Sequence, residues 1–157
     1  KWHDISFVGG HEENRDRSNL ERTAHRELLE EVPQLRKVSG FDLTPLTAEL
    51  RHGPVYSQSA RERVVYQLQF FLLRCASSPA PVLQAMTSRS PNILVSEQDL
   101  VRSKRYKISG LVELLDRSLS GGLHSIPFSW GDDLGEGVGE LYQAQRAQLQ
   151  LDFDLPA

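Results

Sequence analysis

The sequence predicts an α/β domain in which helices are layered on a mixed β-sheet. Segments rich in β-branched and aromatic residues predict strands, and the clearest of them covers residues 63–75. Segments whose apolar residues recur every three or four positions predict helices, most clearly residues 18–32 and 109–119. Because strands and helices are interleaved along the chain, a layered sandwich is the expected architecture.

The first expected strand covers residues 2–8, with Ile5 and Phe7 on one face. Gly9-Gly10 ends it. Residues 11–17 then contain no apolar side chain. We therefore expect this charged segment to lie in solvent or around a charged ligand.

The helix that follows has clear signals at both ends. Ser18 is expected as the N-cap, with Glu21 reaching back to complete a capping box. Pro33 cannot continue a helix and ends it. The side expected to be buried is an apolar stripe at every fourth position: Leu20, Ala24, Leu28 and Val32.

The middle of the chain predicts three strands. Residues 38–43 form the first, and residues 47–56 the second, which Gly53-Pro54 interrupts. Residues 63–75 form the third, and the near-continuous apolar end of this strand predicts that both of its faces are covered. The second and third strands are candidates for a hairpin. The remaining expected elements are a helical turn at 82–86, a strand at 92–95, helices beginning at 96 and 109, a glycine-rich acidic loop at 131–139 and a helix at 140–151.

Composition excludes several classes of protein. The net charge of −3 gives no surplus of positive charge that would indicate general nucleic-acid binding. Cys75 is the single cysteine, so a disulfide framework or a cysteine zinc site within the chain is excluded, and a reducing cytoplasm is the expected location. The longest apolar run, at residues 70–73, is too short to cross a membrane.

The start of the chain bears on its domain organisation. It begins at Lys1 rather than at Met and opens directly on an expected strand. We therefore expect a single domain, residues 1–157, excised from a longer polypeptide. An additional domain or a homodimer is compatible with this expectation.

The expected helix at 18–32 carries the strongest functional signal. Glu27, Glu30 and Glu31 stand at positions i, i+3 and i+4, so their side chains meet on one face beside the apolar stripe. Like charges at this spacing repel one another, and a divalent cation such as Mg²⁺ or Mn²⁺ removes the repulsion. Hard cations take oxygen ligands of this kind, usually together with phosphate oxygens.

Gly9-Gly10, followed by Arg26-Glu27-Leu28-Leu29-Glu30-Glu31, resembles the signature of the Nudix hydrolase family. That signature reads G-x5-E-x7-R-E-U-x-E-E-x-G-U, where U is bulky and aliphatic. The resemblance implies a Nudix-like α/β/α sandwich with a mixed β-sheet. It also implies that Arg26 steadies the preceding loop through an ion pair. The implied metal-binding carboxylates are Glu27, Glu30 and Glu31.

The loop before the helix departs from the signature. Counting back from Arg26 places the signature's first glutamate on Ser18 and its first glycine on Glu12. Counting forward from Gly10 places the acidic position on Asp16, in a loop two residues longer than usual. This second alignment leaves open an ion pair between Asp16 and Arg26.

The resemblance implies metal-dependent hydrolysis of a diphosphate linkage in a nucleoside-diphosphate-type substrate. Glu30 or Glu31 would accept the proton from the attacking water, or a distant glutamate would, for which Glu97 and Glu113 are weaker candidates. Beyond the helix, Pro33-Gln34 replaces the final glycine and aliphatic residue. Two alternatives therefore stay open: a catalytically weak or inactive Nudix-like domain that binds a nucleotide as a sensor, and a structural domain whose acids are only surface charge.

Other residues have two interpretations each. Arg51, Arg61 and Arg63 flank the expected hairpin, where they could meet phosphates or simply protect strand edges. Tyr56 and Tyr66 could stack on a base or pack within the hairpin. Two further features indicate structure rather than chemistry: the histidines show no metal-ligand spacing, and Cys75 is expected to be buried in a strand.

Overall fold

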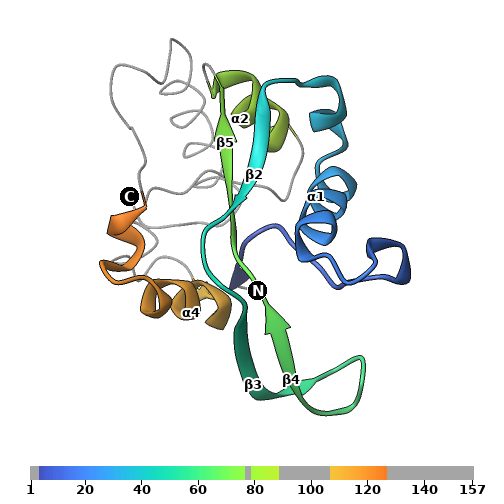
Figure 1. Cartoon of the computed structure of the whole chain (residues 1–157), viewed down its shortest axis with the longest axis vertical. Helices are drawn as coiled ribbons and strands as arrows, with labels where there is room; N and C mark the ends of the chain where they lie inside the picture. Colours follow the sequence, from blue (N-terminus) through green and yellow to red (C-terminus); the bar gives the residue numbers. More distant parts are fainter. Residues whose placement is uncertain (1–3, 77–78, 89–106, 127–157) are drawn as a thin grey trace.

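The computed structural model of the chain describes residues 4–76, 79–88 and 107–126 (Figure 1). Its strands are β1 (Asp4–Ile5), β2 (Phe41–Pro45), β3 (Leu50–Ser57), β4 (Glu62–Leu68), β5 (Phe71–Cys75) and β6 (Lys107–Ile108). Its α-helices are α1 (Leu20–Glu31), α2 (Ala80–Thr87) and α4 (Gly110–Ser118). Three short 3-10 helices are η1 (Asn14–Asp16), η2 (Pro33–Lys37) and η3 (Gly122–Ser125). The predicted α/β class is confirmed.

The predicted single mixed β-sheet is wrong for the described residues, because their strands pair two by two in three separate sheets. β1 and β6 are parallel, whereas β2 pairs with β5 and β3 with β4 in antiparallel fashion. The β2–β5 register runs from Phe41 opposite Cys75 to Pro45 opposite Phe71. In Figure 1 the β3–β4 hairpin extends away from the helices at the lower edge of the molecule.

The single strand predicted at residues 63–75 is wrong, because the chain divides it into β4 and β5. At the division, the Phe70 carbonyl accepts a hydrogen bond from the Leu46 amide at 2.9 Å, and the Gln69 side chain donates to the Thr47 carbonyl at 2.7 Å. These bonds hold a corner at which the chain passes from one strand pair to the next. The predicted hairpin is confirmed only for its first half, where β3 meets β4.

Helices cover both faces of the β2–β5 pair. Phe41, Leu43 and Leu73 pack against the buried cluster formed by α1, η2 and α2. Leu72 and the adjoining Phe70 pack against a second cluster, formed by α4 and η3. Figure 1 shows α1 and α4 on opposite sides of these strands. The apolar end of the predicted third strand is therefore covered on both faces, as expected.

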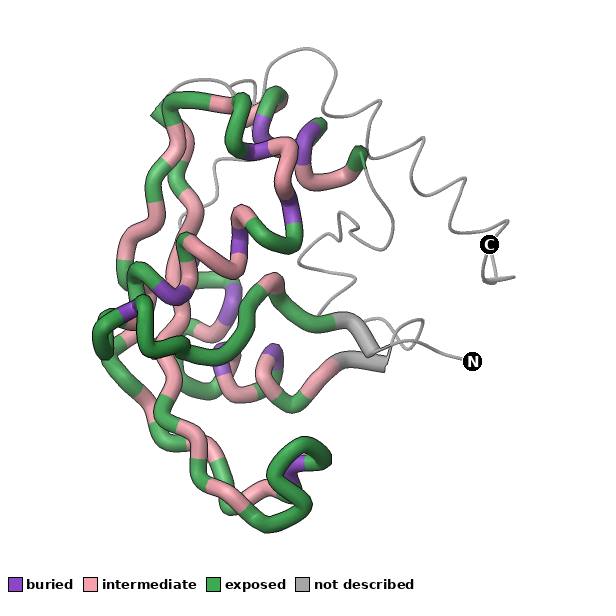
Figure 2. The backbone as a smooth tube through the Cα atoms, turned by 90° about the vertical axis from the view of Figure 1, so that its right-hand side faces the viewer, coloured by how far each residue is buried: buried purple, intermediate pink, exposed green. Residues whose placement is uncertain are grey.

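The β3–β4 hairpin has one face open to solvent. Along β4 the residues alternate between exposed and intermediate, and Val65 is 47% exposed. Figure 2 shows the same hairpin mostly as exposed and intermediate residues. The predicted interruption at Gly53-Pro54 is confirmed in part: β3 continues through these residues, but its pairing with β4 is irregular there, with a register shift between His52 and Val55.

Helix α1 begins one residue later than predicted. Ser18 has a φ of 56°, in the left-handed region, whereas an N-cap residue normally has an extended backbone. Asn19 has that backbone, and its Oδ1 accepts a hydrogen bond from the Arg22 amide at 3.0 Å. Asn19 is thus the N-cap in place of Ser18. The predicted end before Pro33 is confirmed.

The other predicted elements divide into three groups. The helical turn at 82–86 is longer than expected and forms α2, while the helix at 109–119 is confirmed as α4. Of the first predicted strand, Asp4–Ile5 are paired, whereas residues 6–8 are not in a strand. The predictions for residues 92–95, 96–100, 131–139 and 140–151 lie outside the described residues. No helix in the described part is long and apolar enough to span a membrane.

Candidate functional site

The Arg26 guanidinium joins α1 to the loop that precedes it. Its Nη2 donates to Asp16 Oδ2 at 2.9 Å and to the His11 carbonyl at 2.7 Å. Its Nη1 donates to Glu27 Oε1 at 2.7 Å and to Glu30 Oε2 at 3.1 Å. The Arg26 side chain is only 11% exposed. One planar group therefore fixes the loop and two of the predicted metal ligands together.

Asp16 is the loop's inward-facing acid. Its side chain is 5% exposed and accepts hydrogen bonds from the Glu13 amide at 2.9 Å and from Thr23 Oγ1 at 3.2 Å, besides those from Arg26. The bonds from Arg26, followed by the one from the Glu13 amide, lower the pKa of the Asp16 carboxyl from 3.8 to about 2. The ion pair that the forward alignment left open is therefore present.

The same contacts give the charged segment its fold. Glu13 and Asp16 form a reciprocal capping box around η1, which tightens the chain into a turn beside α1. The expectation that residues 11–17 lie in solvent or around a ligand is wrong for Asp16, because a neighbouring arginine neutralises this carboxylate inside the protein. Most other residues of the segment are exposed.

The three predicted metal ligands have different surroundings. Glu27 is 16% exposed, and its carboxylate lies so close to Gly10 that a side chain at Gly10 would collide with it. Glu30 is 41% exposed and also accepts a hydrogen bond from Arg15 at 2.6 Å. Both carboxylates are thus engaged by arginines.

Glu31 lies next to the glycine pair. The Gly9 amide donates to the Glu31 carboxylate, which lowers its pKa, but partial burial and the negative charge of Glu27 outweigh this bond and raise the pKa. Burial is the larger cause of this raised pKa, and the second cause is the negative charge of Glu27, a repulsion that the spacing of these acids predicts. The glycine pair at the end of the first strand therefore contacts two of the three acids.

Glu27, Glu30 and Glu31 carry carboxylate oxygens, the type of ligand that hard divalent cations take. Glu27 and Glu31 supply carboxylate oxygens whose mutual repulsion a cation would relieve. Oxygens of Glu27 and Glu30 already converge on one positively charged atom, Arg26 Nη1. Within the described residues, no group of three His, Cys, Asp or Glu side chains is gathered closely enough to hold a metal ion. A metal would therefore have to draw Glu30 away from its arginines.

Of the two other candidate acids, only Glu113 lies in the described part of the chain. Glu113 is an exposed residue of α4, which packs on the opposite side of the β2–β5 pair from α1. Glu97 lies outside the described residues. Among the described residues, Glu30 and Glu31 are therefore the candidate proton acceptors that adjoin the loop.

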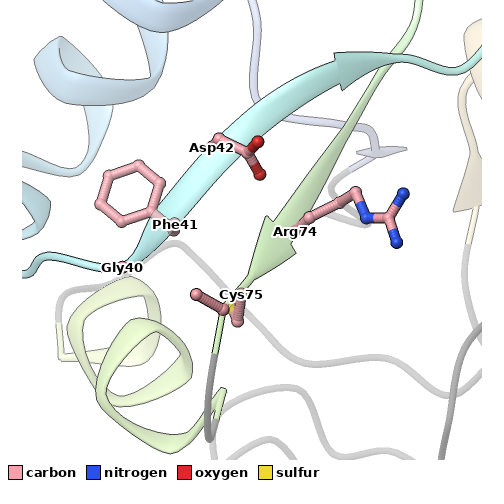
Figure 3. A pocket seen from close by; sticks show the side chains of 6 residues that line it. Gly40, Phe41, Asp42, Arg74 and Cys75 are labelled. Atoms are coloured by element: carbon pink, nitrogen blue, oxygen red, sulfur yellow. The ribbon is translucent and has the colours of Figure 1, made fainter.

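A hollow of about 450 Å³ lies at the end of the β2–β5 pair (Figure 3). Asp42 and Arg74, which lie opposite each other in the strand register, both line it. Cys75 also lines the hollow, and burial together with the charge of Asp42 raises the pKa of its thiol. A thiol with a raised pKa is a poor nucleophile, which agrees with the structural role predicted for Cys75.

Sequence reasoning missed two members of the site. Arg15 contacts Glu13 at 2.7 Å as well as Glu30, and the carbonyl of His11 completes the shell of Arg26. The pairing of Arg15 depends on a turn in the loop, which apolar periodicity could not reveal. The available signal was the Glu13-x-x-Asp16 spacing, which is that of a capping box.

Comparison with known proteins adds no assignment. No protein-family model matches the chain, and no curated protein or solved structure matches it either. The functional argument therefore rests on the residues of the α1 face and of the loop.

Proposed function

We propose that this chain is a Nudix-like domain that hydrolyses a diphosphate linkage in a nucleoside-diphosphate-type substrate, with Mg²⁺ or Mn²⁺ as cofactor. The observation that carries the proposal is the ion pair between Arg26 and Asp16, whose side chains are 11% and 5% exposed. It supplies the loop contact that the family signature requires and that the sequence alone left open. The Arg-Glu-Leu-Leu-Glu-Glu core of the signature is intact on α1.

The layering of the chain supports the same proposal. Helices α1 and α2 pack on one face of the β2–β5 pair and α4 on the other, which is the arrangement expected of an α/β/α sandwich. The strand, loop and helix that carry the signature follow one another in the expected order: β1, η1 and α1.

Each residue of the face has a role in this reaction. Glu27, Glu30 and Glu31 would hold the metal ion, which lowers the pKa of a bound water and neutralises the diphosphate. Arg26 orients Glu27 and Glu30 and ties them to the loop. Glu30 and Glu31 are the candidates for taking a proton from the water.

Turnover assays with Mg²⁺ and a panel of nucleoside diphosphates linked to different groups test the proposal. We expect metal-dependent hydrolysis that the double substitution Glu30→Gln plus Glu31→Gln abolishes. Glu21→Gln is a matched control, because Glu21 is an exposed acid in the first turn of the same helix. Absence of turnover on every compound, or turnover unaffected by the double substitution, would refute the enzyme proposal.

A second candidate function is a nucleotide-binding sensor module without catalysis. The observation in its favour is that both oxygens of Glu30 are engaged by arginines, Oε1 by Arg15 at 2.6 Å and Oε2 by Arg26 at 3.1 Å. These contacts offset the acidic charge without a metal. Calorimetry followed by analysis of the ligand separates the two functions: a sensor returns the nucleotide intact, whereas the enzyme returns cleaved products.

A further inference from the structure

Two aromatic rings meet where the loop before α1 approaches the β3–β4 hairpin. The centroids of the His11 and Tyr66 rings are 5.7 Å apart, with their planes tilted by 58°. His11 is exposed and Tyr66 is half-buried. Neither residue belongs to the two apolar clusters of the core. The pair therefore presents ring surface at the protein's exterior rather than filling an interior.

The backbone of His11 ties this ring pair to the acids. The His11 carbonyl accepts a hydrogen bond from Arg26 Nη2 at 2.7 Å. Nη1 of the same guanidinium donates to Glu27 at 2.7 Å and to Glu30 at 3.1 Å. The His11 backbone is thus linked to two of the proposed metal ligands through a single guanidinium group. Its position relative to Glu27 and Glu30 is therefore fixed.

The hairpin extends the same aromatic surface. Tyr66 on β4 lies directly opposite His52 on β3. Side chains opposite each other in an antiparallel pair share one face and are close neighbours. By the alternation of β4, Val64 also lies on this face, and all three of these residues are half-buried. His11 approaches this face from the loop.

We infer that His11 and Tyr66, with His52 beside them, bind the heteroaromatic ring of the substrate, so that the substrate class is a nucleotide held by its base as well as by its diphosphate. The inference rests on the proposed function, because it requires a diphosphate bound at Glu27, Glu30 and Glu31, with the nucleoside extending toward His11. Bases stack on aromatic side chains through their faces, which all bases share. The site therefore selects for a base while discriminating little between purines and pyrimidines.

Binding of AMP, UMP and ribose 5-phosphate in the presence of Mn²⁺ tests the inference. These compounds contain no diphosphate linkage, so the proposed reaction does not consume them, and ribose 5-phosphate lacks only the base. Since base stacking contributes about 1–3 kcal/mol, we expect both nucleotides to bind roughly 5- to 150-fold more tightly than ribose 5-phosphate. Isothermal calorimetry measures the three dissociation constants.

Substitutions on the two faces of the hairpin assign the preference to the ring pair. Tyr66→Leu and His11→Ala are expected to reduce the preference for nucleotides while leaving the affinity for ribose 5-phosphate unchanged. Tyr66→Phe keeps a ring and is expected to preserve the preference. Tyr56→Leu is the matched control, because Tyr56 is 63% exposed and lies opposite Arg63 on the other face of the hairpin.

The outcomes distinguish this inference from the proposed hydrolysis. Equal affinity of the unaltered protein for nucleotides and ribose 5-phosphate, or no affinity for either, would overturn it. So would a preference that persists in both Tyr66→Leu and His11→Ala. A ring-dependent preference in a protein that cleaves no diphosphate compound supports the inference and refutes the hydrolysis. Hydrolysis without a ring-dependent preference does the reverse.

Discussion

Alanine at Gly10 is expected to weaken metal binding while leaving the fold intact. A Cβ at this position would overlap the carboxylate of Glu27. That carboxylate is the end of a flexible side chain, so it can move where a backbone atom could not. It is also 16% exposed and bound to Arg26 at 2.7 Å, so its movement disturbs an organised contact.

The size of the effect follows from what Glu27 is proposed to do. Loss of a group that positions a metal ligand typically costs about 10- to 100-fold in metal affinity. The backbone at Gly10 lies outside the left-handed region, so alanine causes no backbone strain there. Gly→Ala substitutions at such positions typically stabilise a protein by about 0.4–1 kcal/mol through the unfolded state. We therefore expect a loss of affinity without a loss of folding stability.

A Mn²⁺ titration followed by electron paramagnetic resonance measures this loss. Gly9→Ala is the control, because a Cβ on the preceding residue would meet no atom within 4 Å. Urea denaturation of both variants verifies that the fold is unaffected. Equal Mn²⁺ affinity in Gly10→Ala and Gly9→Ala would refute the placement of Glu27 in the metal site.

Three further predictions follow from the loop and the core. Arg15→Ala is expected to tighten Mn²⁺ binding roughly 1.4- to 5-fold, because it removes an ion pair that competes with the metal for Glu30 and an exposed ion pair contributes about 0.2–1 kcal/mol. The side chains of Arg15 and Glu30 are 60% and 41% exposed. Weaker Mn²⁺ binding than in the Arg22→Ala control would contradict this prediction. The pKa of the Asp16 carboxyl lies near 2 in the folded chain, below its ordinary 3.8, so the unfolded chain binds more protons between these values and stability falls as the pH falls through them. Asp16→Asn should flatten that part of a plot of unfolding free energy against pH, and an unchanged slope would argue against the ion pair. Leu35→Ala should cost about 2–5 kcal/mol in urea denaturation, because Leu35 is 1% exposed within the α1–η2–α2 cluster; a cost well below this range would mean that the cluster does not hold α1.

The predictable parts of the site are those encoded by local periodicity. The apolar stripe of α1 and Pro33 located the helix, and Leu28 and Val32 are buried as that stripe requires. The spacing of Glu27, Glu30 and Glu31 placed their carboxylates beside the stripe without any tertiary information. Burial of the β5 segment on two faces also followed from its continuous run of apolar residues.

The missed parts depend on contacts between segments distant in the sequence. The division of residues 63–75 arises from bonds between Phe70 and the corner at Leu46 and Thr47, which no pattern within the strand encodes. The N-cap moved to Asn19 because Arg17 and Ser18 both adopt left-handed backbone conformations. Periodicity describes what one segment buries, whereas these features follow from how two segments meet.

The ion pair between Arg26 and Asp16 holds the loop before α1 against the helix. This ion pair can form whatever the number of residues between Gly10 and Asp16, provided that the chain turns back as it does at η1. An insertion among the exposed residues between Gly10 and Asp16 would therefore extend the loop into solvent and leave the carboxylates of α1 in place. Such a loop has to keep the ion pair between its acid and the helix arginine, whereas its length can vary. A search for related chains that requires a fixed spacing would therefore overlook chains that keep this ion pair in a loop of another length.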